Sequence, residues 1–141
     1  MTKKVTGGCH CGAVRYECEA APLFGVTCYC TDCQTFYGGE KGLGLVLPRE
    51  ALRVTGEVTY YESVGGSGQP VERGFCPTCG TQLIGKPGIA PHLVSVSVGS
   101  LDDASGFQTT ICVYTSSAQP WSHLPDDVPS FEKMPDQIPE A

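Results

Sequence analysis

Apolar and polar residues alternate along several short stretches of the chain. In residues 14–18, Val14, Tyr16 and Cys18 alternate with Arg15 and Glu17. A period of two places successive side chains on opposite faces of a β-strand, so this stretch predicts a half-buried strand with one solvated face. β-branched and aromatic residues also favour strands, and further strands are expected at residues 43–47, 52–55, 58–63, 93–98 and 107–115.

Turn-forming residues separate these stretches. The chain contains 18 glycines and 11 prolines, which interrupt regular structure and favour tight connections. Gly56 and Glu57 predict a turn between residues 52–55 and 58–63, and the Gly-rich residues 65–70 predict a flexible hairpin loop. Helical periodicity is almost absent, and at most one or two helical turns are expected after Cys30. The predicted fold class is therefore all-β.

The length of the chain predicts one domain. A chain of 141 residues can bury one core but not two independent ones. The core is expected within about residues 5–119. Residues 120–141 are rich in proline and predict a C-terminal strap without regular structure. Trp121, Leu124 and Phe131 are expected to pin this strap to the core, with Trp121 as a packing anchor.

Composition and charge narrow the class of protein. A hydrophobic content of 40% and a mean hydropathy of −0.06 are typical of a folded, soluble chain. The formal net charge of −6 disfavours a nucleic-acid partner, and no stretch is apolar enough to span a membrane. Lys3 and Lys4 precede Gly7 and Gly8 rather than an apolar run, so no secretory signal is expected. We therefore predict a cytoplasmic protein with reduced cysteines.

Seven of the nine cysteines fall into three tight groups whose spacing predicts zinc binding. Cys76 and Cys79 form a Cys-x-x-Cys turn followed by Gly80, and Cys9 and Cys11 lie between glycines that permit a sharp bend. Zinc takes four protein ligands in structural sites but three in catalytic sites. These four cysteines are therefore expected to form one closed structural zinc site.

The remaining group, Cys28, Cys30 and Cys33, predicts a second, open zinc site. Three thiolates leave one coordination position for a substrate. A substrate thiol entering that position would be kept as a nucleophilic thiolate. These residues therefore predict chemistry on a thiol, or attack of a thiol on a small electrophile.

Other interpretations of these residues remain open. The triplet also fits a second structural zinc completed by His10, His92 or a carboxylate, or a thiol cluster without metal. His10 is expected to face solvent, with a catalytic base as the alternative role. The sequence also predicts surface positions for His92 and His123, buried apolar positions for Cys18 and Cys112, and a turn or capping pair at Asp102 and Asp103.

The order of these motifs resembles the glutathione-dependent formaldehyde-activating enzyme family. The resemblance covers about residues 5–132 and is carried by four segments, namely residues 7–16, 28–33, 73–83 and 99–103. It implies an Mss4-like fold of several twisted antiparallel sheets. It also implies a structural zinc on Cys9, Cys11, Cys76 and Cys79, and a more labile zinc on Cys28, Cys30 and Cys33.

The activity implied by the resemblance is that of a carbon–sulfur lyase, run as addition of glutathione to formaldehyde. Members of the family often carry basic residues directly after the third cysteine of the triplet, where this chain has Gln34 and Thr35. Arg73, Lys41 and Lys86 are the alternative cations for an anionic thiol. Two further functions fit the same residues: a non-catalytic zinc-binding interaction module, and a redox or metal sensor based on the triplet.

Overall fold

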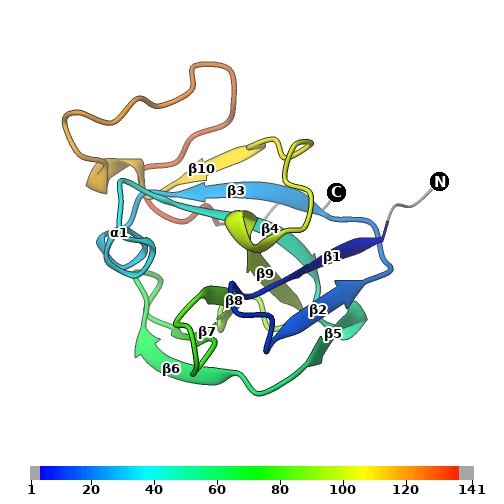
Figure 1. Cartoon of the computed structure of the whole chain (residues 1–141). Helices are drawn as coiled ribbons and strands as arrows, with labels where there is room; N and C mark the ends of the chain where they lie inside the picture. The colour runs from blue at the N-terminus through cyan, green and yellow to red at the C-terminus, as the bar shows by residue number, and fades with distance from the viewer. Residues whose placement is uncertain (1–3, 137–141) are drawn as a thin grey trace.

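A computed structural model describes residues 4–136, which form two β-sheets with one short helix between strands. The three-stranded sheet has the order β1 (Val5–Gly8), β2 (Arg15–Cys18) and β5 (Leu52–Thr55). The seven-stranded sheet has the order β10 (Ile111–Val113), β3 (Phe24–Cys28), β4 (Gly42–Pro48), β9 (Leu93–Ser97), β8 (Gln82–Pro87), β7 (Pro70–Phe75) and β6 (Thr59–Val64). Figure 1 shows the small sheet lying beside the large, strongly curved one.

Helical structure is confined to short segments among the described residues. Helix α1 (Thr31–Tyr37) begins directly after Cys30, which confirms the expectation of one or two turns there. Three 3-10 helices cover Arg49–Ala51, Val98–Ser100 and Thr115–Ser117. The all-β class is therefore confirmed.

Most strands predicted from alternation are present. Strands β2, β4, β5, β6 and β9 lie within one or two residues of their predicted bounds, and Tyr16 and Cys18 of β2 are buried as the alternation requires. Residues 65–70 connect β6 to β7 as the predicted hairpin loop. The chain from β5 to β6, however, passes from one sheet to the other, so Gly56 and Glu57 do not close a hairpin.

Four strands were not predicted, and one is shorter than predicted. Strands β1, β3, β7 and β8 contain glycine or proline, which obscured their alternation. Within the predicted stretch 107–115, only β10 forms a ladder, and it pairs with β3 in parallel rather than antiparallel. Just before β10, the side-chain hydroxyl and the backbone N–H of Thr110 both donate to the Gly25 carbonyl, at 3.0 Å and 2.9 Å. The sheets are therefore mostly, but not wholly, antiparallel.

The pleat of the large sheet separates two apolar clusters. Leu47, Val94 and Val96 pack with Tyr16 and Cys18 of the small sheet to form the main core. A smaller cluster contains Val46 of β4, Leu93 of β9 and Ala90 of the β8–β9 connection, with Leu23, Phe24 and Val26 packed against it. Because neighbouring residues of a strand point to opposite faces, Val46 and Leu47 belong to different clusters. The second cluster borders the site described below.

The C-terminal strap is attached by its backbone rather than by the three apolar side chains expected to pin it. Trp121 is 63% exposed, and Leu124 and Phe131 are also exposed, so the prediction of a packing anchor was wrong. The backbone of Cys112 instead donates to Pro129 and accepts from Phe131, both at 2.9 Å. In Figure 1 the strap, drawn in orange and red, passes the outer edge of β10.

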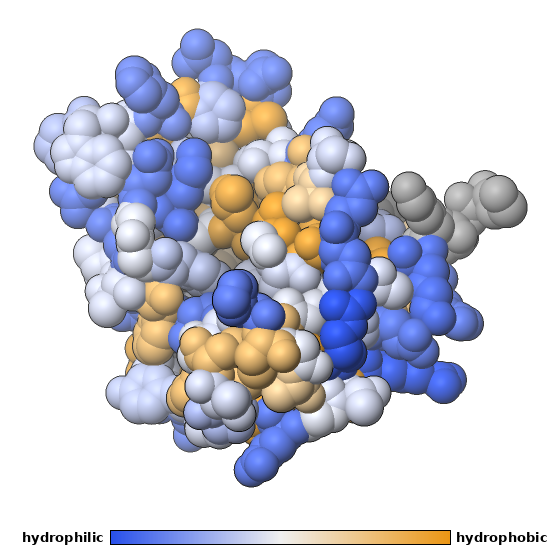
Figure 2. Space-filling model, in the orientation of Figure 1, coloured by the Kyte–Doolittle hydropathy of each residue, from blue (hydrophilic) through white to orange (hydrophobic). Residues whose placement is uncertain are grey.

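The surface is largely polar. Figure 2 shows hydrophilic side chains around apolar patches on one face of the molecule. In residues 4–136 no helix has the length and apolar character needed to cross a membrane.

Candidate metal centres

Four cysteine sulfurs converge where two strand connections meet. Cys9 and Cys11 lie in the turn between β1 and β2, and Cys76 and Cys79 lie between β7 and β8. All four sulfurs lie within 4.8 Å of one another, with 3.6 Å between Cys9 and Cys11 and 3.8 Å between Cys11 and Cys76. Four sulfurs at about 2.3 Å from one tetrahedral zinc ion would lie about 3.8 Å apart. This cluster therefore has the donor set and spacing of a closed metal site.

Glycines shape both turns of the four-cysteine cluster. Gly12 and Gly80 have φ values of 84° and 80°, which an L-residue with a Cβ rarely adopts. The Gly80 N–H donates to the Cys76 carbonyl at 2.8 Å, and the Gly12 N–H donates to the Cys9 carbonyl at 3.2 Å. The predicted bend between Cys9 and Cys11 is therefore present.

Thr81 links the two turns and tunes one of the thiols. The His10 N–H donates to the Thr81 hydroxyl at 3.1 Å, and that hydroxyl lies 3.2 Å from Cys79 Sγ. Hydrogen bonds from the Thr81 hydroxyl, and then from its backbone, lower the pKa of Cys79 to about 5. Val14 N–H also donates to Cys9 Sγ at 3.2 Å. Such donors stabilise the thiolate form that binds a metal.

The three remaining sulfurs converge at the junction of β3 and α1. Cys28 is the last residue of β3, Cys30 is the N-cap of α1, and Cys33 lies in its first turn. Residues three apart share one face of a helix, which brings Cys33 next to Cys30. The Cys33 N–H donates to Cys30 Sγ at 3.3 Å. All three sulfurs lie within 4.8 Å of one another and are half-buried.

The three thiols of the triplet change one another's pKa values. Hydrogen bonds from Cys28 and Cys33 lower the pKa of Cys30 to about 2, and Arg73 lowers it further by a smaller amount. Hydrogen bonds to Cys30 and Cys33, together with burial, raise the pKa of Cys28. Three thiols this close cannot all ionise unless a cation compensates them. A divalent metal meets that requirement, so the donor set fits a metal ion.

Arg73 is the basic residue of this site. Its side chain comes from β7 and lines the same pocket as the triplet, although the residue is only 8% exposed. Its guanidinium lies 4.6 Å from the centre of the Phe36 ring, and Nη1 donates to the Ser63 hydroxyl at 3.3 Å. The sequence offered Arg73 only as one of three candidate cations, because β7 was not predicted. Neither Lys41 nor Lys86 lines the pocket; they lie over the Tyr29 and Tyr60 rings.

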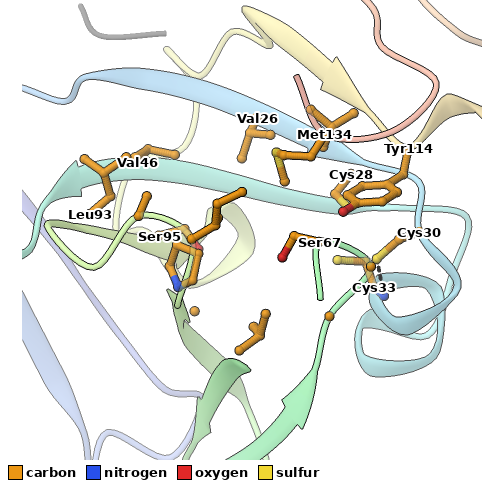
Figure 3. Close-up of a pocket in the computed structure, with 18 of the residues that line it drawn as sticks. Val26, Cys28, Cys30, Cys33, Val46, Ser67, Leu93, Ser95, Tyr114 and Met134 are labelled. Atoms are coloured by element: carbon orange, nitrogen blue, oxygen red, sulfur yellow. Dashed lines mark hydrogen bonds between the residues drawn. The ribbon is translucent and has the colours of Figure 1, made fainter. Parts of the chain in front are cut away.

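A pocket of about 200 Å³ adjoins the triplet. Figure 3 shows Cys28, Cys30 and Cys33 at one end of the pocket and Val46 and Leu93 at the other. The C-terminal strap contributes Met134 and Pro135 to the wall, and the β6–β7 loop contributes residues 65–67. The triplet is thus open to a space that a small molecule can occupy, whereas none of the four-cysteine cluster lines this pocket.

Tyr114 is a functional candidate that the sequence did not indicate. It lines the pocket beside the triplet (Figure 3) and has a φ of 56°, which is strained for a residue with a Cβ. Strained backbone persists where surrounding structure fixes it, often at functional sites. Burial, followed by the nearby sulfur charges, raises the pKa of Tyr114, so its phenol stays protonated and can donate a hydrogen bond.

Gln34, which stands where the family often has a basic residue, has a structural role. Its amide Nε2 donates to the carbonyls of Tyr29 at 2.7 Å and Ser117 at 3.0 Å, and its Oε1 accepts from Gln119 Nε2 at 2.8 Å. It therefore ties α1 to the chain that follows β10. Thr35 is exposed and donates to the Thr31 carbonyl.

The remaining candidates have no place in either cluster. Over residues 4–136, no histidine or carboxylate joins the sulfurs of the triplet, and His10 is exposed as expected. Cys18 and Cys112 are fully buried, as predicted for apolar positions. Asp102 forms an ion pair with Arg15. The Asp103 carboxylate accepts from the backbone and hydroxyl of Ser105 in the predicted turn.

Three comparisons with known proteins agree with this arrangement. A Halomonas elongata protein named "Putative glutathione-dependent formaldehyde-activating enzyme" is 37% identical over 82 residues, which are 55% of this chain and 52% of that protein. The chain thus spans about half the length of this curated relative. A crystal structure of a Rhodobacter sphaeroides protein matches with a TM-score of 0.57 and 26% identity, over 72% of this chain and 91% of that one.

The third comparison identifies the family. The family model described as "Glutathione-dependent formaldehyde-activating enzyme" matches residues 4–117, a range that contains all seven clustered cysteines. The chain therefore belongs to the glutathione-dependent formaldehyde-activating enzyme family.

Proposed function

We propose that this protein is a zinc-dependent carbon–sulfur lyase, which adds a small-molecule thiol such as glutathione to a small aldehyde such as formaldehyde, or catalyses the reverse reaction. One observation carries the proposal: three convergent cysteine sulfurs adjoin a pocket of about 200 Å³. A purely structural metal site gains nothing from such a space. The names of the family and of the Halomonas elongata relative supply the substrates.

The two clusters have different proposed roles. Soft thiolate donors favour zinc over hard cations. We assign a structural zinc to Cys9, Cys11, Cys76 and Cys79, and a second, labile zinc to Cys28, Cys30 and Cys33. Nine free cysteines also favour a reducing compartment, so we propose that the reaction takes place in the cytoplasm.

The reaction is an addition to a carbonyl group. The thiol sulfur forms a bond to the aldehyde carbon, the carbonyl π bond opens, and the proton lost from the thiol ends on the resulting oxygen. Zinc held by three thiolates would keep a substrate thiol deprotonated at neutral pH and thereby nucleophilic. In the reverse direction the carbon–sulfur bond breaks, and the hydroxyl proton returns to the sulfur.

Residues around the triplet supply the remaining chemistry. The Arg73 cation offsets the negative charge that a further thiolate would bring to three cysteine sulfurs. The Tyr114 hydroxyl can donate to the aldehyde oxygen as negative charge develops there. Apolar residues line the rest of the pocket and limit the water around these groups, which strengthens both interactions.

The test is turnover of zinc-loaded protein against a panel of thiols and aldehydes, with adduct formation and breakdown followed by NMR exchange. The proposal expects acceleration over the zinc-loaded Cys30→Ser protein with at least one thiol–aldehyde pair. Equal rates for both proteins across the panel would contradict it and favour an interaction module. Reversible loss of one zinc on oxidation, without any turnover, would favour a sensor built on the triplet.

A further inference from the structure

The pocket beside the triplet has two chemically different ends. Near the sulfurs, Figure 3 shows Ser67 and Tyr114 in the wall. The lining residues Asp32, which lies between Cys30 and Cys33 in α1, and Arg73, whose charge acts on Cys30, belong to the same end. At the opposite end, the wall is formed by members of the smaller apolar cluster, including Phe24, Val46, Ala90 and Leu93. Formaldehyde and the sulfur of a thiol need only the first end.

Small residues on one face of the large sheet create the hollow. Gly85 and Ser95 line the pocket on the neighbouring strands β8 and β9. A Cβ on Gly85 would lie 2.8 Å from the Ser95 hydroxyl oxygen, so a larger side chain at residue 85 would crowd Ser95. The absence of a side chain on Gly85 and the short side chain of Ser95 leave room on this face of the sheet. Gly85 and Ser95 thus form a floor of small residues, and the walls at the far end of the pocket are apolar.

The charges of the pocket suit an apolar group better than a further anionic one. Apart from the triplet cysteines, Asp32 and Arg73 are the charged residues among the described residues that line it, and Arg73 is buried against Phe36. The far end offers no cation for a carboxylate within its described wall. Burying an unpaired charge there would be strongly unfavourable, whereas burying methylene groups is favourable.

We propose that this far end is an apolar subsite, which selects thiol–aldehyde adducts carrying an alkyl or aryl group of about six carbon atoms. An apolar cavity of about 150 Å³ binds benzene. The whole pocket, from the triplet to the far end, has a volume of about 200 Å³, so a group of about six carbon atoms is the largest that the far end can accept. The inference deepens the proposed function, since it assumes that the reacting carbon and sulfur lie at the triplet. The apolar group can belong to the aldehyde or to the thiol, because both are joined at that point.

Inert thioethers test the subsite without any turnover. We would measure the dissociation constants of S-methyl-, S-butyl-, S-hexyl- and S-decylglutathione for the zinc-loaded full chain by calorimetry. Affinity is expected to rise by about threefold to fourfold per methylene group and to level off near the hexyl chain. Equal affinity for the methyl and hexyl compounds would overturn the subsite.

Matched variants locate the effect. Val46→Phe fills the far end and is expected to lower the affinity for S-hexylglutathione by about tenfold, with the methyl compound unaffected. Val54→Phe makes the same change on β5, outside the pocket, and is expected to change neither. Because overpacking can prevent folding, Met134→Ala provides a second test: it removes part of the wall on the strap and should lower affinity for the hexyl compound several-fold. The same loss in Val54→Phe as in Val46→Phe would contradict the assignment.

Turnover distinguishes the two sources of the apolar group. One series pairs glutathione with formaldehyde, butanal and hexanal, and the other pairs formaldehyde with butanethiol and hexanethiol. A rising kcat/KM in the first series assigns the subsite to the aldehyde, and in the second series to the thiol. Graded thioether binding without turnover supports the subsite but contradicts the proposed reaction. Turnover of formaldehyde, together with equal affinity for all four thioethers, would support the proposed reaction but contradict the subsite.

Discussion

The two cysteine clusters differ in how the chain brings their ligands together. In the four-cysteine cluster, 65 residues separate Cys11 from Cys76, and the sulfurs meet only when β1, β2, β7 and β8 are in place. In the triplet, all three sulfurs come from one strand end and the first turn of one helix. A metal in the first cluster would therefore hold the fold together, whereas a metal in the second would bridge only local structure.

The two clusters also differ in the groups that surround them. Backbone N–H groups and Thr81 surround the four-cysteine cluster, which offers four sulfur donors. The triplet has one donor fewer and adjoins a pocket with Arg73 and Tyr114. The number of sulfur donors, their separation in sequence and their access to a pocket therefore vary together: one cluster suits stability, and the other suits chemistry.

The largest expected effect is that of Cys79→Ser in the four-cysteine cluster. Zinc binding at such sites contributes about 10–16 kcal/mol, which is comparable with the total stability of about 5–15 kcal/mol of a domain. Cys79 is exposed, so the change removes a ligand without leaving a cavity. We expect the zinc-treated variant to lose its cooperative thermal transition, as followed by circular dichroism. Melting within a few degrees of the unchanged protein would show that the four-cysteine cluster does not hold the fold together.

The matching change in the triplet, Cys30→Ser, is expected to preserve the fold and abolish turnover. Serine is a favourable N-cap, so its hydroxyl can accept the Cys33 N–H in place of the sulfur. Loss of residues that merely support a metal ligand costs about 10–100-fold, so loss of a ligand should lower adduct formation by at least about 100-fold. Metal analysis should find one zinc instead of two. Unfolding as severe as in Cys79→Ser would show that both clusters are structural.

Tyr114→Phe tests whether the Tyr114 hydroxyl, in the wall of the pocket, takes part in the reaction at the triplet. The change removes one hydroxyl but keeps the ring and the strained backbone at φ 56°. Removing a hydrogen-bond donor to a developing oxyanion costs about 10²–10³-fold in kcat, so we expect a loss of about 10²-fold with an unchanged melting temperature. Tyr61→Phe serves as control, because that ring is 54% exposed and lies outside the pocket. Equal kcat values for the two variants would remove Tyr114 from the mechanism.

The smallest effect is expected from Asp102→Asn, which breaks an ion pair near the four-cysteine cluster. Arg15 lowers the pKa of Asp102 to about 2. A lowered pKa stabilises the folded state above the unfolded value of about 3.9, and this contribution disappears as pH falls through about 2. At pH 7 it is fully present, so the variant should melt slightly lower. The difference should shrink in 1 M salt; a difference independent of salt would indicate a cause other than charge.

The sequence predicts the sites better than it predicts the strands. Cys-x-x-Cys and Cys-x-Cys spacings restrict sulfurs to a single turn, so spacing alone groups the triplet and each pair of the other cluster. The two distant pairs were joined because a structural zinc takes four protein ligands. Strands β7 and β8 contain Gly74, Gly85 and terminal prolines, which weaken the alternation on which strand prediction depends. Their antiparallel pairing is fixed by neighbours in the sheet, not by local preference.

The sequence named Arg73 as one of three candidate cations but did not place it at the triplet, and it did not indicate Tyr114, for a related reason. Arg73 reaches the pocket from β7, and Tyr114 reaches it because β10 pairs in parallel with β3. Both placements depend on contacts between residues far apart in sequence. The strap was misjudged because Trp121 and Phe131 are apolar, yet backbone hydrogen bonds to Cys112 hold this segment. Local patterns do not contain that information.

Stepwise removal of metal is the most direct test of the different roles proposed for the two clusters. The zinc-loaded protein would be titrated with a competing chelator while released zinc and far-UV circular dichroism are recorded together. We expect the first zinc equivalent to leave with loss of turnover and no change in the spectrum, and the second to leave with unfolding. Release of both equivalents in one step, or unfolding with the first, would contradict the division between a structural and a reactive cluster.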